Sequence, residues 1–174
     1  MSIENCCMSY RVYTTEAVIL KKADIGEADK LFSFFTKDFG RLEIKAQGAR
    51  YLKSKLRYHL SGRAILKISF VGSNGEYWRL VGCNEQIVFD NIKNDFLKTK
   101  STERVLSFVE RLIQGQQKDE KLWNALVESF VLINTRSFVC FDLKKFEQEM
   151  FAKFLAELGY GGADIESALE KSML

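Results

Sequence analysis

Hydrophobic and polar residues follow two different rhythms in the two halves of the chain. In residues 41–47, Leu42, Ile44 and Ala46 alternate with charged or polar side chains, which is the period of a half-buried strand. Similar β-rich runs lie at residues 15–22, 30–36, 66–70 and 77–89. The pattern predicts five short strands in the N-terminal half, the last of them bent near Gly82.

Turn signals separate these strands and suggest how they connect. Gly26 and Gly40 end short polar turns, and Asn74-Gly75 is a strong two-residue hairpin signal. Five short strands suit a small closed barrel, in which closure removes exposed edges. We therefore expect an OB-fold, with residues 48–62 forming the long connection between its third and fourth strands.

Beyond residue 100 the period becomes helical. Val105, Leu106 and Val109 begin an apolar stripe, with Ser101 as the expected N-cap. Two further helices are expected at residues 119–136 and from Asp142 to a glycine cap at Gly159, and Asp164 is a candidate cap for a short last helix. The predicted class is α+β: an OB-fold domain at residues 1–92, followed by a small helical domain at residues 93–174 packed on the barrel.

Charge is distributed unevenly along this framework. Residues 41–67 contain eight of the 26 basic side chains and one acidic residue, Glu43. The remaining 18 basic and 22 acidic residues give a net charge of −4. A local basic excess on a mildly acidic protein is typical of a surface that binds a polyanion, although solvated lysine-rich surfaces are also common.

The chain offers no recognisable catalytic or metal-binding constellation. His59 is the single histidine, the four cysteines lack C-x-x-C spacing, and no phosphate-binding glycine loop is present. Glu27 and Asp29 follow Gly26 in a turn, where carboxylates usually bond backbone N–H groups and fix the turn. We expect no enzyme activity, cofactor, metal, small-molecule substrate or membrane span, and a cytoplasmic location.

Three ordered motifs resemble the RecO family of bacterial DNA repair and recombination mediators. They are a G-E-x-D-x-L turn at residues 26–31, an F-T-x-x-x-G segment at residues 35–40 and an A-x-G-x-R-x-x-K-S connection at residues 46–54. A thinner similarity in the second half ends in Leu158-Gly159-Tyr160. Many family members carry a four-cysteine zinc motif directly after this segment, whereas residues 161–168 contain no cysteine, and the helical domain is expected to be reduced.

The resemblance implies a function as well as a fold. RecO-like proteins bind single- and double-stranded DNA, anneal complementary strands, act with RecR, and remodel single-stranded-DNA-binding protein so that recombinase loads. It also implies a location at the nucleoid.

The candidate DNA-binding residues combine cations with interleaved aromatic rings that can stack on bases. They are Arg41, Lys45, Arg50, Lys53, Lys55, Arg57, Arg63, Tyr51 and Tyr58. The alternative interpretation is that both tyrosines pack against the barrel rim. Two other functions stay open: an adaptor that recruits repair partners through the helical domain with weak DNA binding, and an RNA-binding OB module.

Overall fold

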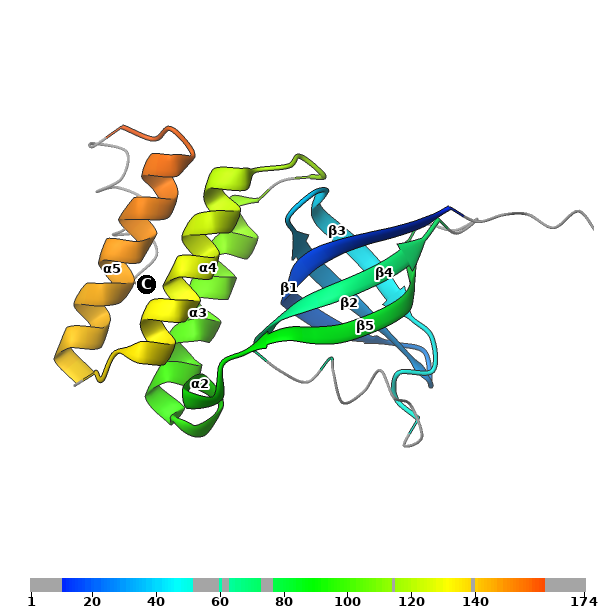
Figure 1. The fold of residues 1–174 in the computed structure, drawn as a ribbon, viewed down its shortest axis with the longest axis horizontal. Helices are drawn as coiled ribbons and strands as arrows, with labels where there is room; N and C mark the ends of the chain where they lie inside the picture. The colour runs from blue at the N-terminus through cyan, green and yellow to red at the C-terminus, as the bar shows by residue number, and fades with distance from the viewer. Residues whose placement is uncertain are drawn as a thin grey trace, which may run out of the picture.

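The computed structural model describes residues 11–51, 60, 63–72, 77–113, 115–138 and 140–161. Five strands come first: β1 (Val12–Ile25), β2 (Asp29–Thr36), β3 (Gly40–Ala46), β4 (Ala64–Val71) and β5 (Trp78–Val88). They close into a barrel in the order β1-β2-β3-β5-β4 (Figure 1). The predicted fold class, an OB-type barrel of five strands followed by helices, is confirmed.

Barrel closure depends on the length and bending of β1. Its first half pairs antiparallel with β4 and its second half with β2, so that Ala17 has a partner on both sides. The register shifts between Ile19 and Lys21, where an extra residue lets the strand turn from one neighbour to the other. β3 and β5 close the barrel by a short parallel pairing, Ile44 with Trp78 and Lys45 with Arg79. The register of β5 also shifts beside Gly82, as expected from the sequence.

The barrel interior explains the alternation in β3. Leu42 and Ile44 face inward together with Phe32 and Phe34 of β2, and all four side chains are buried. Because side chains on a strand alternate between its faces, the charged residues of β3 point outward.

In the part of the chain that the structure describes, four helices follow the barrel and stand beside it (Figure 1). They are α2 (Asp90–Asn94), α3 (Phe96–Leu112), α4 (Glu120–Thr135) and α5 (Cys140–Glu157). The carboxylate of Asp95 caps α3 by accepting the N–H of Leu97 at 2.8 Å. The prediction of Ser101 as N-cap was therefore wrong: it is fully buried one turn inside α3. Asp119, the expected first residue of the next helix, is instead the N-cap of α4, which begins at Glu120.

The end of α5 has the geometry expected from Gly159. This glycine has φ of 86°, its N–H bonds to the carbonyl of Ala156 at 3.0 Å, and the next N–H, of Tyr160, bonds to Leu155 at 3.0 Å. Those two bonds form a Schellman cap. The hairpin signal Asn74-Gly75 and the candidate cap Asp164 lie outside the described residues.

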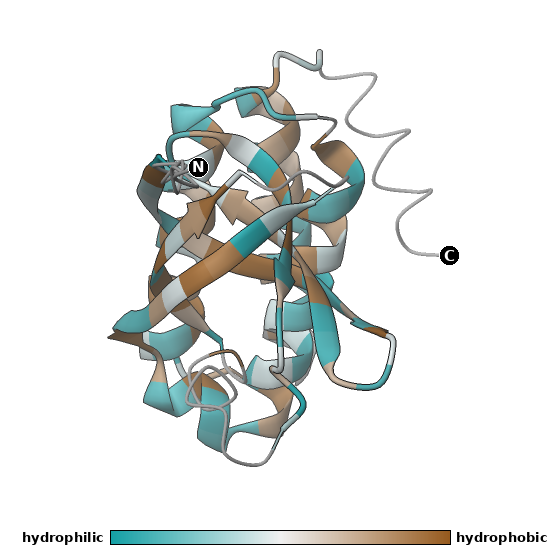
Figure 2. Ribbon diagram, turned by 90° about the vertical axis from the view of Figure 1, so that its right-hand side faces the viewer, coloured by the Kyte–Doolittle hydropathy of each residue, from teal (hydrophilic) through white to brown (hydrophobic). Residues whose placement is uncertain are grey.

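The helices cover part of the outer face of the barrel. Val18, Phe35 and Ile65 point away from the barrel interior and join the helices in a second core. The Phe35 ring lies 5.7 Å from the Trp123 ring of α4. This explains why β2 is apolar on both faces. Figure 2 shows hydrophobic and hydrophilic residues following one another along the strands and helices. A division into domains at residues 1–92 and 93–174 stays a prediction.

A second contact fixes the segment between α3 and α4 against the start of β3. The N–H of Arg41 bonds to the carbonyl of Gly115 at 3.3 Å. Gly40 has φ of 66°, and a Cβ there would lie only 2.3 Å from the carbonyl oxygen of Gln117. Only glycine fits both the backbone conformation and the close approach.

Candidate nucleic-acid interface

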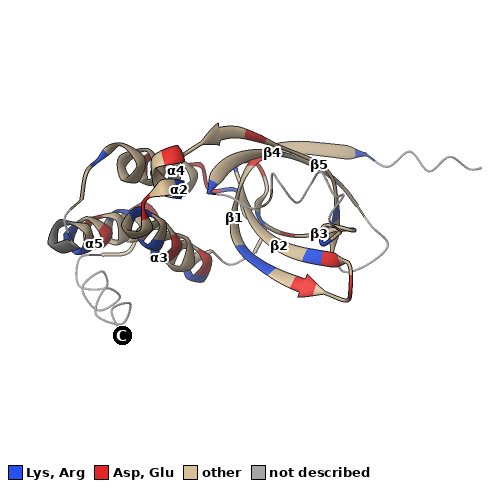
Figure 3. Ribbon diagram, turned by 90° about the horizontal axis from the view of Figure 1, so that it is seen from below, with Lys and Arg blue, Asp and Glu red and all other residues tan. Residues whose placement is uncertain are grey.

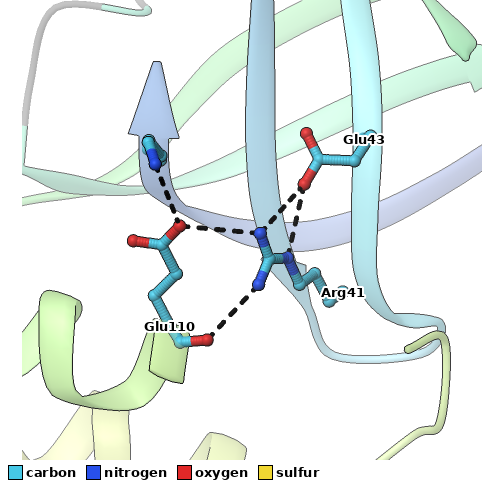
Figure 4. Close-up of polar contacts among 4 residues, drawn as sticks. Arg41, Glu43 and Glu110 are labelled. Carbon is cyan, nitrogen blue, oxygen red and sulfur yellow. Dashed lines mark hydrogen bonds and ion pairs between the residues drawn. The ribbon is translucent and has the colours of Figure 1, made fainter. Parts of the chain in front are cut away.

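Arg41, the first candidate of the basic stretch, connects the barrel to α3. Its guanidinium donates to Glu43 Oε1 at 3.3 Å and to the carbonyl of Glu110 at 3.3 Å, and it lies 3.5 Å from Glu110 Oε1 (Figure 4). Lys21 of β1 reaches the same carboxylate at 3.8 Å. The Arg41 side chain is 28% exposed, and its charge is matched by two carboxylates. These contacts hold β3 against α3, so the Arg41 side chain has a structural role.

Arg63 makes a comparable tie at the start of β4. Its guanidinium pairs with Glu103 of α3. Lys67, further along β4, is exposed and has no ion-pair partner among the described residues. Arg41 and Arg63 are thus both held by carboxylates of α3.

Lys45 and Asp29 meet where β3 ends and β2 begins. Lys45 Nζ lies 2.9 Å from Asp29 Oδ2, and Asp29 Oδ1 accepts the N–H of Gly48 at 2.8 Å. These contacts lower the pKa of Asp29: the N–H of Gly48 contributes most, followed by the hydrogen bond from Lys45. Asp29 therefore bonds the next connection rather than its own turn.

Arg50 completes the connection between the two segments. Its N–H bonds to the carbonyl of Ala28 at 3.0 Å, and its Nη1 donates to the carbonyl of Gly26 at 2.9 Å. Its Nε lies 3.9 Å from Asp24, whose pKa is lowered mainly by a hydrogen bond from Lys30. We call residues 47–51 the strap, and its contacts with residues 24–29 the clasp.

Tyr51 ends the strap and is 64% exposed. Its N–H bonds to the carbonyl of Gly48 at 3.1 Å. Its ring lies beside Gly48, where an added Cβ would come within 3.2 Å of the ring. The clasp thus presents one aromatic ring to solvent beside Arg50. Lys53, Lys55, Arg57 and Tyr58 lie outside the described residues.

The electrostatics differ from the picture given by counting charges along the chain. Arg41, Lys45, Arg50 and Arg63 all have carboxylate partners. Apart from Glu43, those partners come from outside the basic stretch: Asp24, Asp29, Glu103 and Glu110. Acidic and basic residues accordingly follow one another along β1 and β2 (Figure 3). Much of the sequence-local charge excess is neutralised in space.

Two lysines outside the basic stretch lie near Asp24, which also faces Arg50, and were missed. Lys30 opposes Ala46 in the β2–β3 ladder and pairs with Asp24 at 2.8 Å. Lys22 is exposed on β1 opposite Phe32. Lys30 lies in the G-E-x-D-x-L motif at the start of β2. Antiparallel pairing sets the start of β2 opposite the end of β3, where the strap begins, and would have placed Lys30 beside the strap. Glu27, grouped with Gly26 and Asp29 in the predicted turn, is exposed.

The part of the chain that the structure describes holds no cluster of three or more His, Cys, Asp or Glu side chains arranged for a metal ion. Burial raises the pKa of the Cys83 thiol to about 12. Among the described helices, none is long and apolar enough to cross a membrane.

Comparison with known proteins gives a consistent result. A family model described as Recombination protein O N terminal matches residues 8–77. The DNA repair protein RecO of Thermoanaerobacter sp. (strain X514) is 31% identical over 130 residues, covering 71% of this chain and 50% of that protein.

Two further relatives share that name. The DNA repair protein RecO of Caldanaerobacter subterraneus subsp. tengcongensis is 32% identical, over 65% of this chain and 45% of that protein. That of Roseiflexus sp. (strain RS-1) is 26% identical, over 88% of this chain and 52% of that protein. The chain spans about half the length of these curated relatives.

Proposed function

Because the chain belongs to the RecO family, we propose that it is a DNA repair protein whose barrel binds single- and double-stranded DNA. The observation that carries the proposal is the clasp. OB-folds bind oligonucleotides on the face of strands 2 and 3 and on the loop between strands 1 and 2. In this barrel that loop is fastened to a strap that carries Arg50 and the exposed Tyr51.

The helices limit which part of this face DNA can reach. Phe35 is covered by α4, and Arg41 is held by Glu110 of α3. The opposite end of the same strands carries Lys45, the strap and the turn at Gly26. We therefore place the DNA footprint at the clasp end of the barrel.

The proposed contacts divide the candidate residues into two groups. Cations for the phosphates and rings for the bases are Lys45, Arg50, Lys53, Lys55, Arg57, Tyr51 and Tyr58. Arg41 and Arg63 would reach DNA only by giving up their carboxylates on α3. Five phosphate contacts on a single strand predict a log–log salt slope of about −3.5. The slope becomes shallower, about −2.1, when the carboxylates beside Lys45 and Arg50 suppress counterion release at those two residues.

A site of this kind performs its function by binding alone. A cationic surface lowers the repulsion between the phosphates of two strands while their base edges stay free to pair, so annealing needs no chemical step. In the full proposal the protein acts at the nucleoid as a mediator. It works with a RecR-type protein and with single-stranded-DNA-binding protein to help load recombinase.

Charge reversal outside the clasp tests the DNA-binding surface. Lys53, Lys55 and Arg57 are replaced together by Glu, because Arg50 also holds the strap. Binding of a labelled single-stranded oligonucleotide is followed by fluorescence anisotropy across a salt series. Losing three of five contacts predicts a slope no steeper than about −1.4, with weaker binding at low salt.

A matched control removes the same charge from the helices. Lys121, Lys144 and Lys145 are exposed on α4 and α5 and are likewise replaced by Glu. Affinity close to that of the unmodified chain is expected here. Equal losses in the two triple variants would refute the assigned surface, because they would show a response to net charge alone.

One observation favours a second function as a protein adaptor. Phe96, at the start of α3, is 73% exposed, with Lys100 lying 5.7 Å over its ring. Exposed aromatic rings are enriched at protein interfaces. Unchanged single-strand affinity in a Phe96→Ala variant that loses binding to a RecR-type protein would support an adaptor function of the helical half.

A further inference from the structure

The clasp joins two segments that lie about 20 residues apart in the sequence, through the side chains of Asp29 and Arg50. Asp29 contacts both the strap and the end of β3. One carboxylate oxygen fixes the N–H of Gly48, and the other lies 2.9 Å from Lys45 Nζ. Gly48 in turn holds Tyr51 through its carbonyl. The side chain is partly buried, with 23% of its surface exposed.

We propose that Asp29 is a positioning residue that makes the site select strands bearing bases over bare polyanions. This inference rests on the proposed function, because it concerns how the same surface distinguishes its ligands. Through Gly48, Asp29 holds the strap so that the Tyr51 ring stays available for stacking. Through Lys45, it removes one cation from the set that binds any phosphate.

The two actions have separate consequences for binding. Stacking on an aromatic ring needs a base, so it favours an ordinary strand over an abasic strand of the same length. Phosphate contacts are the same for both strands, so a cation released from its carboxylate strengthens both. The fixed ring therefore sets the preference for strands that bear bases, and the suppressed cation lowers the affinity for both kinds of strand.

Two substitutions at Asp29 separate these actions. Asp29→Asn keeps an oxygen that accepts the Gly48 N–H but removes the negative charge beside Lys45. Asp29→Ala removes both. Glu149→Gln, which removes one negative charge from an exposed position on α5, controls for the change in net charge.

Affinities for oligo-dT and for an abasic strand of equal length are measured with the full chain. We expect the unmodified chain to prefer oligo-dT by roughly 5- to 150-fold, the contribution of stacking one base. Asp29→Asn should bind both strands more tightly, with the preference kept and the salt slope steeper by about 0.7. Asp29→Ala should lower the preference by the contribution of one stacked base, as Tyr51→Ala should.

Hydrogen exchange without DNA provides a second measurement. The amides of Gly48 and Arg50 should stay protected in Asp29→Asn and exchange faster in Asp29→Ala. An Asp29→Ala variant that keeps the preference for oligo-dT, or two Asp29 variants with the same preference, would overturn the inference alone. An unmodified chain that does not bind oligo-dT at low salt would instead overturn the proposed function.

Discussion

Replacing Phe35 by alanine would remove the ring that β2 contributes to the core shared by the barrel and the helices. Phe35 is fully buried, and its ring lies 5.7 Å from that of Trp123. Truncating a buried phenylalanine costs about 3–5 kcal/mol. Total unfolding free energies are typically about 5–15 kcal/mol, so this single change removes a large share of the stability.

The two tryptophans allow each half of the protein to be followed separately. Trp123→Phe leaves Trp78 as a reporter in the barrel, and Trp78→Phe leaves Trp123 as a reporter in α4. Urea unfolding is measured by fluorescence in both backgrounds. With a urea dependence of about 2 kcal/mol per molar, Phe35→Ala should lower the midpoint by about 1.5–2.5 M in both.

A chemically identical control lies on the surface. Phe96→Ala, at a residue that is 73% exposed, should change stability by about 0.5 kcal/mol or less. Two separate transitions, or a Phe35→Ala effect seen by Trp123 alone, would refute the reasoning. The barrel and the helices would then not unfold as the single unit that the shared core implies.

Two further predictions concern Gly40 and Asp29. Gly40→Ala should lower the stability by about 1–2 kcal/mol because of the positive φ, and by more because of the contact with Gln117. Gly115 also has a positive φ but has open space around it, so Gly115→Ala should lower the stability by about 1–2 kcal/mol only. Thermal melting compares the two variants, and equal losses of stability would contradict the contact between Gly40 and Gln117. Because folding lowers the pKa of Asp29 below its ordinary 3.8, its stabilisation is present above that pH and is lost as the pH falls through the folded pKa. The difference in unfolding free energy between the unmodified chain and Asp29→Asn should therefore shrink as the pH falls. A difference that stays constant would contradict the lowered pKa of Asp29.

The sequence predicted the strands well because their determinants are local. Residues 41–47 alternate because one face of that strand lies in the barrel core. The run around Phe34 and Phe35 is apolar on both faces, and it was nevertheless predicted as a strand. The N-terminus of α3 was placed late because its first turn lacks the apolar stripe and depends on Asp95. The five-residue helix α2 was too short to produce a period.

The candidate site was harder to predict because ion pairs depend on tertiary structure. Arg41 meets Glu110, 69 residues further along the chain, and Arg63 meets Glu103. No local pattern indicates such partners, so a basic stretch looked like an open basic surface. The motif residues Asp29 and Arg50 were found from the sequence. Their contacts with Gly48 and Gly26 could not be predicted, because they form only when the strands are arranged in the barrel.

The location of bound DNA tests the account most directly. A single-stranded oligonucleotide carrying photoreactive thymine analogues is crosslinked to the full chain, and the modified peptides are identified by mass spectrometry. The account predicts crosslinks at Tyr51, at the clasp end of the barrel, and elsewhere within residues 45–58. Crosslinks confined to α3, α4 and α5, with residues 45–58 unmodified, would contradict it.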